Sequence, residues 1–179
     1  MEIRGKHLVL TSTGLDDAEV LLPVFNGDKQ FNMWSGFPSD MTLDDVQRDM
    51  YETQQLPEGI VWRIDRIVES LDVENKQSDT LVGIAETALH PNPETGWIAL
   101  LIIQQAFQGR GYGSEAASLL EQYLYSYPTV QRIGLGVLLK NLPAQRFWEG
   151  RSYTRGERKL DSMGHDCYEY HLTLQLMQR

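Results

Sequence analysis

The stretch Trp97-Ile-Ala-Leu-Leu-Ile-Ile103, followed by Gln108-Gly-Arg-Gly-Tyr-Gly-Ser114, decides how this chain of 179 residues folds. Seven consecutive apolar residues are too few to cross a membrane, and turn signals flank them, so they predict a strand buried on both faces. After the loop, apolar residues recur at helical spacing up to Tyr127, and Pro128 ends the pattern. The stretch 97–127 therefore predicts a strand, a glycine loop and a helix.

Gly109, Gly111 and Gly113 alternate with other residues in this loop. Glycine reaches positive φ without strain, and the first turn of the next helix adds unpaired N–H groups and the positive end of its dipole. The segment is therefore a candidate anion site, although a plain turn between strand and helix explains the glycines equally well. A Walker loop is excluded because no Gly-Lys-Ser/Thr follows. A dinucleotide fold is disfavoured because the next strand ends in Lys140-Asn141 instead of an acidic residue.

The composition predicts one soluble domain covering residues 1–179. With 41% hydrophobic residues, a chain of this size buries roughly 70% of its unfolded surface. The single cysteine, Cys167, has no internal partner and the N-terminal segment has no apolar run, so a cytoplasmic location is expected. The net charge of −9 argues against a nucleic-acid partner, and no membrane association is expected. The excess of carboxylates favours a cationic partner, although solubility explains it equally well.

Hydrophobic periodicity and turn signals predict the remaining elements. The predicted strands are 6–11, 59–68, 81–90, 97–103, 131–139, 153–160 and 168–176. The predicted helices are 13–26, 42–54, the one from the glycine loop to Tyr127, and 142–151. The aromatic-rich segment 31–38 is expected to be a connection, and the polar stretch 71–80 a mobile hairpin tip. The predicted order is β-α-α-β-β-β-α-β-α-β-β.

This order, with a Gln-x-x-Gly-x-Gly/Ala loop after the fourth strand, resembles the GNAT superfamily of acyl-CoA-dependent N-acyltransferases. The loop match runs from Gln108 to Ala116, and a second motif from Asn141 to Tyr153 reads Asn-x-x-Ala-x-x-Phe-Trp-x-x-x-x-Tyr. Residues 112–117 and 153–157 are most similar to the branch that includes the ribosomal-protein N-terminal acetyltransferases. The resemblance implies an α/β (α+β) fold with a mixed, mostly antiparallel sheet flanked by helices.

The resemblance also implies acetyl-CoA as co-substrate, and no metal. Backbone N–H groups of the loop would hold the CoA pyrophosphate, the central strand would pair with the pantetheine arm, and an asparagine would hydrogen-bond that arm from the neighbouring strand. Asn141 is equally well placed to cap the helix that starts at Leu142, and the two roles are compatible. The residues implied for the cofactor are Ile102, Ile103, Gln104, Gln108, Gly109, Arg110, Gly111, Tyr112, Gly113, Ser114 and Asn141.

The implied reaction is direct attack of a neutral primary amine on the acyl carbon, across a gap between two splayed central strands. An alkyl ammonium with a pKa near ~10.4 must first lose a proton. The chain departs from the family pattern at Trp148, where many relatives have a tyrosine acid, and at Gly136, where some have a glutamate base. Glu86 is the candidate base, because it is expected to face inward together with Val82 and Ile84. The alternative for Glu86 is an ion pair with Arg63.

Trp34 and Trp62 are the candidate acceptor-binding residues, because aromatic faces attract cations. The acceptor is expected to be a protein N-terminus, which the branch resemblance favours, or a small-molecule cationic amine, which the acidic composition favours. The alternative function is a non-catalytic acyl-CoA-binding module, which the departures at Gly136 and Trp148 favour. Because family members often pair, a homodimer through 168–176 is a further expectation.

Overall fold

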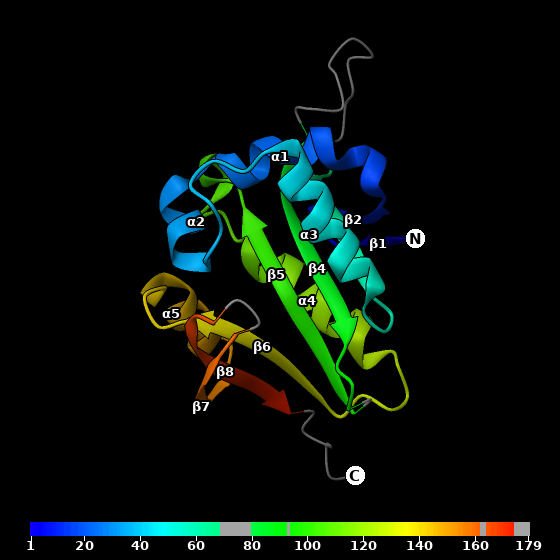
Figure 1. Cartoon of the computed structure of the whole chain (residues 1–179). Helices are drawn as coiled ribbons and strands as arrows, with labels where there is room; N and C mark the ends of the chain where they lie inside the picture. The colour runs from blue at the N-terminus through cyan, green and yellow to red at the C-terminus, as the bar shows by residue number, and fades with distance from the viewer. Residues whose placement is uncertain (69–79, 93, 162–163, 174–179) are drawn as a thin grey trace.

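The computed structural model of the chain describes residues 1–68, 80–92, 94–161 and 164–173. Most of the predicted hairpin tip, 71–79, and the predicted strand end, 174–176, lie outside the described residues. Within the described ranges, eight strands form one sheet in the order β1-β2-β3-β4-β5-β6-β8-β7 (Figure 1). No helix in these ranges is long and apolar enough to span a membrane.

The sheet is antiparallel except where β5 runs parallel to β6, so the predicted mixed, mostly antiparallel sheet is confirmed. The short first strand was not predicted, and it pairs with the second. The last strand, β8, lies between β6 and β7. The described part of the segment 168–176, expected to form a dimer interface, is therefore inside the sheet, and β7 forms this edge. The strands are β1 (Glu2–Arg4), β2 (Leu8–Thr13), β3 (Ile60–Arg66), β4 (Leu81–Leu89), β5 (Thr95–Ile103), β6 (Arg132–Leu138), β7 (Thr154–Leu160) and β8 (Asp166–Thr173).

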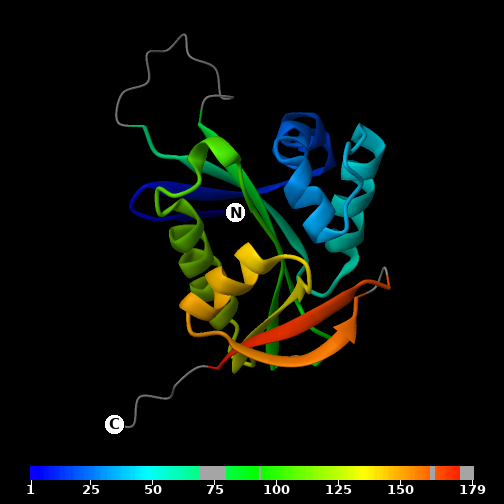
Figure 2. The ribbon, with the colours of Figure 1, turned by 90° about the vertical axis from the view of Figure 1, so that its left-hand side faces the viewer.

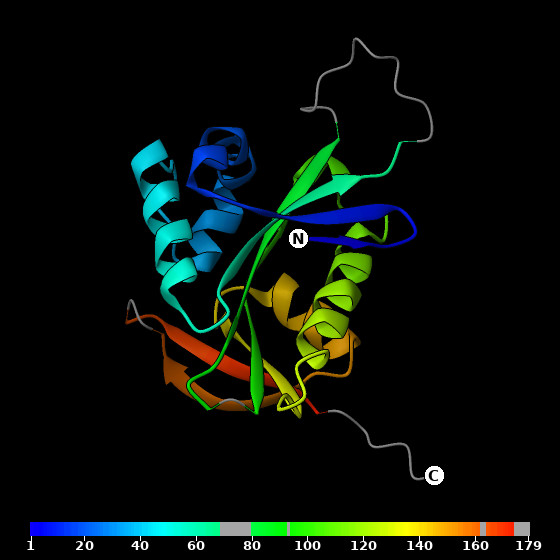
Figure 3. The ribbon, with the colours of Figure 1, turned by 90° about the vertical axis from the view of Figure 1, so that its right-hand side faces the viewer.

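Helices cover both faces of the sheet, as Figures 2 and 3 show from opposite sides. One face carries α1 (Ala18–Asn26), α2 (Lys29–Ser35) and α3 (Leu43–Gln55). The other carries α4 (Tyr112–Tyr125) and α5 (Leu142–Gly150). Short 3-10 turns, Leu15–Asp17 and Gln105–Phe107, precede α1 and the glycine loop.

The segment 31–38, expected to be a connection, contains most of helix α2, which corrects that prediction. Asp28 caps the helix by accepting the N–H of Phe31 at 3.0 Å, and Gly36 ends it with a φ of 81°. The glycine and proline that indicated a loop instead mark the end of a seven-residue helix.

The core consists of two clusters, one on each face of the sheet. Val82 packs in the cluster under α4, whereas Ile84 packs in the cluster under α1 and α3. A β-bulge causes this split, because Ile64 pairs with Gly83 and Asp65 with Leu81, so the register skips Val82. Glu86 therefore shares its face with Ile84 and not with Val82, which corrects one part of the sequence prediction.

The two central strands separate soon after they meet. The ladder between β5 and β6 joins only Thr95–Trp97 to Arg132–Gly134, and the strands then diverge (Figure 1). On its other side β5 carries a bulge, because Glu86 pairs with Leu100 and Thr87 with Ile98, leaving Ala99 without a partner. The expected gap between central strands is therefore present, with an unpaired edge of β5 along one side.

Candidate active site

A cleft of about 740 Å³ opens where β5 and β6 diverge. Strand β5 contributes the stretch from Trp97 to Leu101, and β6 contributes Leu135 to Leu138. Helix α2 reaches across towards β6, because a Cβ on Gly36 would touch His165 and lie 3.6 Å from a Leu138 methyl group. The remaining walls come from α2, α3, the end of β4, α5 and the β7–β8 pair, and include Phe31, Trp34, Asp49, Glu52, Glu86, His90, Asn141, Trp148 and Cys167.

The glycine loop lies at the C-terminal end of β5, where it begins α4. Gly109 and Gly111 have φ values of 72° and 86°, which L side chains rarely adopt, and a Cβ on either would meet no described atom within 4 Å. No side chain caps α4, whose N-cap is Gly111. The first-turn N–H groups thus remain available at an exposed, open surface, as an anion site requires.

Other predicted loop residues hold this arrangement together. Gln108 Nε2 donates to the Ile103 carbonyl at 2.8 Å, which fixes the loop to the end of β5. A Cβ on Gly113 would lie 3.7 Å from Ile103 and 3.6 Å from Phe147, so the start of α4 packs against both β5 and α5. The Arg110 guanidinium lies 5.8 Å from the Phe107 ring centroid and is exposed near the loop. Tyr112 and Ser114 lie in the first turn of α4.

The backbone of Gln104 is already part of the sheet. Its N–H donates to the Val82 carbonyl at 2.9 Å and its side chain donates to the Leu81 carbonyl at 2.8 Å. Ile102 is buried among the α1–α3 cluster and Ile103 is half-buried against the α4 cluster. Gln104 therefore offers no free N–H to an added strand, whereas β5 from Ile98 to Ile103 has no β6 partner in the register.

The second motif shapes the far wall of the cleft. Asn141 is buried and its Oδ1 accepts the N–H of Ala144 at 3.1 Å, so it caps α5. Trp148 is buried between Phe147 and Tyr153 and lines the cleft. Because an indole N–H is not an acid in the physiological range, this wall lacks the tyrosine acid of the family pattern. Tyr153 donates to Glu121 at 3.2 Å, and burial raises its pKa, so it serves packing.

Glu86 faces α3 from the middle of β4. It is 3% exposed, and Thr53 Oγ1 donates to its Oε2 at 2.7 Å. Arg63 does not pair with it, since the guanidinium bonds Asp65 on its own strand, with Nε 2.7 Å from Oδ2. The alternative of a Glu86–Arg63 ion pair is therefore wrong. The titratable group that acts on Glu86 is the carboxyl group of Asp49 on α3.

Burial is the largest cause of the raised pKa of Glu86. It raises the pKa of Glu86 well above its usual range, and the negative charge of Asp49 raises it further, while the Thr53 hydrogen bond opposes both. Burial also raises the pKa of Asp49, to about 6. The cleft wall formed by α3 and β4 thus holds two carboxyl groups that resist being ionised together.

Of the two candidate acceptor residues, only Trp34 lines the cleft. Trp62 is fully buried on the opposite face, where its Nε1 donates to Thr87 at 2.8 Å and its ring contacts Tyr123 on α4, 5.0 Å between centroids. This position corrects the expectation that Trp62 faces the acceptor. The strand alternation gave the two faces of β3 but not which face lies under α4.

The sequence reasoning missed Asp49 and Glu52, which line the cleft from α3. The sequence does contain a pattern that points to Asp49. One helix face is predicted from the spacing of Val46, Asp49, Met50 and Thr53. An aspartate and a threonine on an otherwise apolar, buried face indicate a polar partner across the interface. That partner is Glu86, 37 residues later than Asp49, and no local pattern identifies it.

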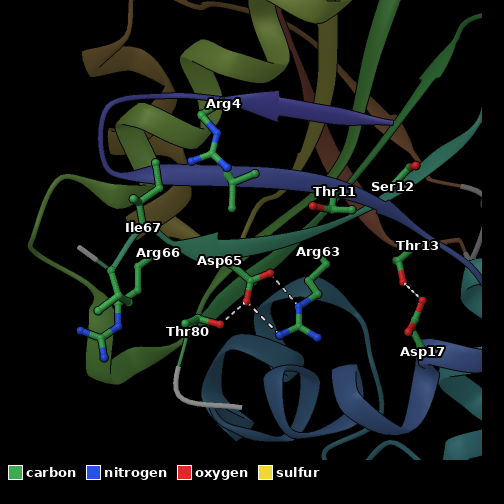
Figure 4. Close-up of a pocket in the computed structure, with 12 residues that line it drawn as sticks. Arg4, Thr11, Ser12, Thr13, Asp17, Arg63, Asp65, Arg66, Ile67 and Thr80 are labelled. Carbon is green, nitrogen blue, oxygen red and sulfur yellow. Dashed lines mark hydrogen bonds and ion pairs between the residues drawn. The ribbon is translucent and has the colours of Figure 1, made fainter. Parts of the chain in front are cut away.

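A second hollow, of about 430 Å³, lies on the β2 and β3 strands away from the splayed edge (Figure 4). Several of its polar and charged groups bond one another. Asp65 bonds Arg63 and accepts from Thr80 at 2.8 Å, and Thr13 hydrogen-bonds Asp17. None of the residues predicted to bind cofactor or acceptor lines it. The larger cleft is therefore the candidate active site.

Comparisons with known proteins agree with this geometry. The sequence model of the acetyltransferase (GNAT) family matches residues 37–153. A comparison with curated protein sequences gave no significant match.

Solved acetyltransferase structures share the fold. An acetyltransferase from Thermus thermophilus superposes with a TM-score of 0.71 at 24% identity, covering 97% of this chain and 100% of that one. An acetyl transferase from Salmonella typhimurium that modifies the N-terminal serine of ribosomal protein L7/L12 gives 0.76 at 13% identity, covering 98% and 100%. The aminoglycoside acetyltransferase AAC(6')-Ib, in complex with coenzyme A, gives 0.71 at 19% identity, covering 94% and 95%.

Proposed function

This chain belongs to the acetyltransferase (GNAT) family, and from that premise we propose that it transfers the acetyl group of acetyl-CoA to a primary amine. The observation that carries the proposal is the continuity of two features. The unpaired edge of β5 begins at Ile98, inside the cleft, and ends beside the uncapped start of α4. An elongated ligand with an anionic end fits such a path.

The residues present fit CoA. The N–H groups of residues 110–114 would hold the pyrophosphate, with help from the N-terminal dipole of α4 and the Arg110 charge. The open space around Gly109 and Gly111 supports a bound anion there, because no described side chain fills it. The pantetheine arm would run along β5 from Ile103 towards Ile98. Asn141 Oδ1 is used as a helix cap, so its amide nitrogen would donate to the arm.

Acetyl-CoA supplies an activated acetyl group, and the chain's own residues must position and deprotonate the amine. Glu86 would act as the base, because it is the buried carboxyl group that lines the cleft from β4. Ala99, which the bulge leaves without a β4 partner, is exposed and lines the cleft, and a backbone N–H of β5 at this point would stabilise the thioester oxygen. Trp148 cannot protonate the leaving sulfur, so CoA would leave as thiolate and take its proton from water.

The acceptor would be a cationic primary amine. Asp49, Glu52 and Glu86 line the α3 side of the cleft, and Trp34 adds an aromatic face beside them. A free protein N-terminus and a small polyamine-like compound both carry such an amine. The likeness to the acetyltransferase of L7/L12 supports the first acceptor, and the likeness to an aminoglycoside acetyltransferase supports the second.

The test combines binding and turnover. Acetyl-CoA at about 100 times its Kd should stabilise the protein by roughly 2.7 kcal/mol, a thermal shift of several degrees. Release of the CoA thiol is then followed with aliphatic diamines, an aminoglycoside and short peptides with free N-termini. Stabilisation without thiol release from any amine would favour the non-catalytic acyl-CoA-binding module. No stabilisation by acetyl-CoA or CoA would overturn both functions.

A further inference from the structure

We propose that Asp49 is a positioning residue for proton transfer: its carboxyl group shares one proton with Glu86, and this pair accepts the proton of a cationic amine. The proposal rests on the proposed function and names the group that prepares its base. It follows from the contacts of the two carboxyl groups and from the charges around them.

The surroundings of the Asp49 and Glu86 carboxyl groups favour a state in which the two groups share one proton. Asp49 Oδ2 and Glu86 Oε1 are both buried, and neither has a hydrogen-bond partner in the described ranges. The remaining oxygen of Glu86 accepts from Thr53 Oγ1 at 2.7 Å. An ionised carboxylate can only accept a hydrogen bond, so a hydrogen bond between these two buried oxygens would require a proton on one of them.

The surroundings contain no cation that bonds the pair within the described residues. On α3, the charge of Glu52 raises the pKa of Asp49 and the charge of Arg48 lowers it, and Arg48 itself bonds Asp45. Strands β3 and β5 place the apolar Val61 and Leu100 beside Glu86 in the register. Five further charged or titratable groups line the same cleft from β7, β8 and the residues that follow β4 and β7, namely His90, Lys159, Asp161, Cys167 and Glu169. Lys159 bonds Glu169 across the β7–β8 ladder.

These contacts determine the charge of the pair at neutral pH. Burial raises the pKa of Asp49 to about 6, and burial together with the Asp49 charge raises the pKa of Glu86 well above its usual range. One carboxyl group is then ionised and the other protonated. The pair carries one negative charge that attracts an ammonium, and it retains one site that accepts a proton.

The proton balance of the transfer needs such a site. The N–C bond to the acetyl carbon forms and the C–S bond breaks, while an ammonium acceptor loses two protons in becoming an amide. One of these protons is lost to water, from which the CoA thiolate takes its own proton. The other goes to the ionised carboxyl group of the pair and then to water. A carboxylate with a raised pKa accepts it more readily than an exposed one.

The pH dependence of kcat/KM tests the role of Asp49. Asp49→Asn removes the like charge and supplies an amide donor to Glu86 Oε1, so the pKa of Glu86 should fall. The lower of the two pKa values of the pair is then lost, so the acidic limb of the profile, which reports it, should move by about one unit or more. Asp44→Asn removes the same charge from an exposed position on the same helix, so the acidic limb of its kcat/KM profile should not move. An acidic limb unmoved in Asp49→Asn, or moved equally in both variants, overturns the proposal.

A measurement without catalysis separates this proposal from the proposed function. In wild-type protein with 13C-labelled carboxyl groups, Asp49 and Glu86 should titrate together, one near pH 6 and the other higher. If both titrate independently below pH 5, the shared proton does not exist, whatever the enzyme acetylates. If they titrate together and no amine is acetylated, the pair stands and the proposed function fails. In an active enzyme, Glu86→Gln should lower kcat by about 10²-fold or more.

Discussion

Trp97 and Gly134 face each other in the last pair of the parallel ladder between β5 and β6, and the indole ring occupies the space where residue 134 would carry a side chain. A Cβ on Gly134 would lie 2.6 Å from Trp97 Cζ3. Beyond this pair the strands diverge and the cleft opens. The glycine therefore lets a large aromatic residue close the end of the cleft.

Gly134→Ala should destabilise the protein by about 1–3 kcal/mol, because the added methyl group overpacks the Trp97 ring. Gly136→Ala is the matched control on the same strand, since its Cβ would meet only Cys167 Sγ, at 3.8 Å. Urea denaturation measures both free energies of unfolding. Equal stability of the two variants would contradict the close approach of Trp97.

Gly111→Ala should abolish stabilisation by CoA while leaving the protein folded. At a φ of 86°, alanine costs about 1–2 kcal/mol and disturbs the N–H groups that begin α4. Gly164→Ala is the control, because Gly164 has a φ of 83° with open space around it and lies outside the cleft. Thermal unfolding with and without CoA should show a lost shift only for Gly111→Ala. A shift retained there, or lost in both variants, would contradict the loop as anion site.

Trp34→Ala should raise the KM for a cationic amine by about 2- to 30-fold, the range expected for a cation–π contact, and leave the KM for acetyl-CoA unchanged. Met33→Ala serves as the comparison, because Met33 is its neighbour on α2, is 64% exposed and does not line the cleft. Steady-state kinetics with both substrates varied separates the two constants. An unchanged amine KM in Trp34→Ala would remove this residue from the acceptor site.

The carboxyl pair should also govern how stability depends on pH. The pKa of Glu86 is raised by burial, so its contribution is fully present below the unfolded-state pKa, near ~4.5, and is lost as pH rises through the folded-state value. The wild-type free energy of unfolding should therefore fall, relative to Glu86→Gln, with a slope approaching about 1.4 kcal/mol per pH unit above pH 5. Urea denaturation of both proteins from pH 5 to 8 measures this difference. Parallel curves would mean that Glu86 ionises normally.

The central strand, glycine loop and helix could be predicted from sequence because local rules determine them. Positive φ at Gly109 and Gly111, the apolar run 97–103 and the proline after Tyr127 each act within a few residues. The helix α2 was missed for a local reason too, since Gly36 and Pro38 mark a loop as readily as a helix end.

The acceptor side could not be predicted in the same way. The alternation in β3 assigns its residues to two faces. Only the packing of α4 on Trp62 shows which of these faces is covered by a helix. The bulge that turns Val82 away from Glu86 depends on pairing between β3 and β4. The contact of Asp49 with Glu86 joins a helix and a strand that are adjacent only after the sheet forms.

The most direct test of the central claim is the perturbation of backbone amide NMR signals by CoA. We expect shifts concentrated in Gly109–Ser114 and in β5 from Ile98 to Ile103, with smaller changes at Asn141, while the hollow around Arg63 and Asp65 stays unaffected. If CoA shifts no signals, or shifts those of that second hollow instead, the assignment of the splayed strands and the glycine loop as the cofactor site is wrong.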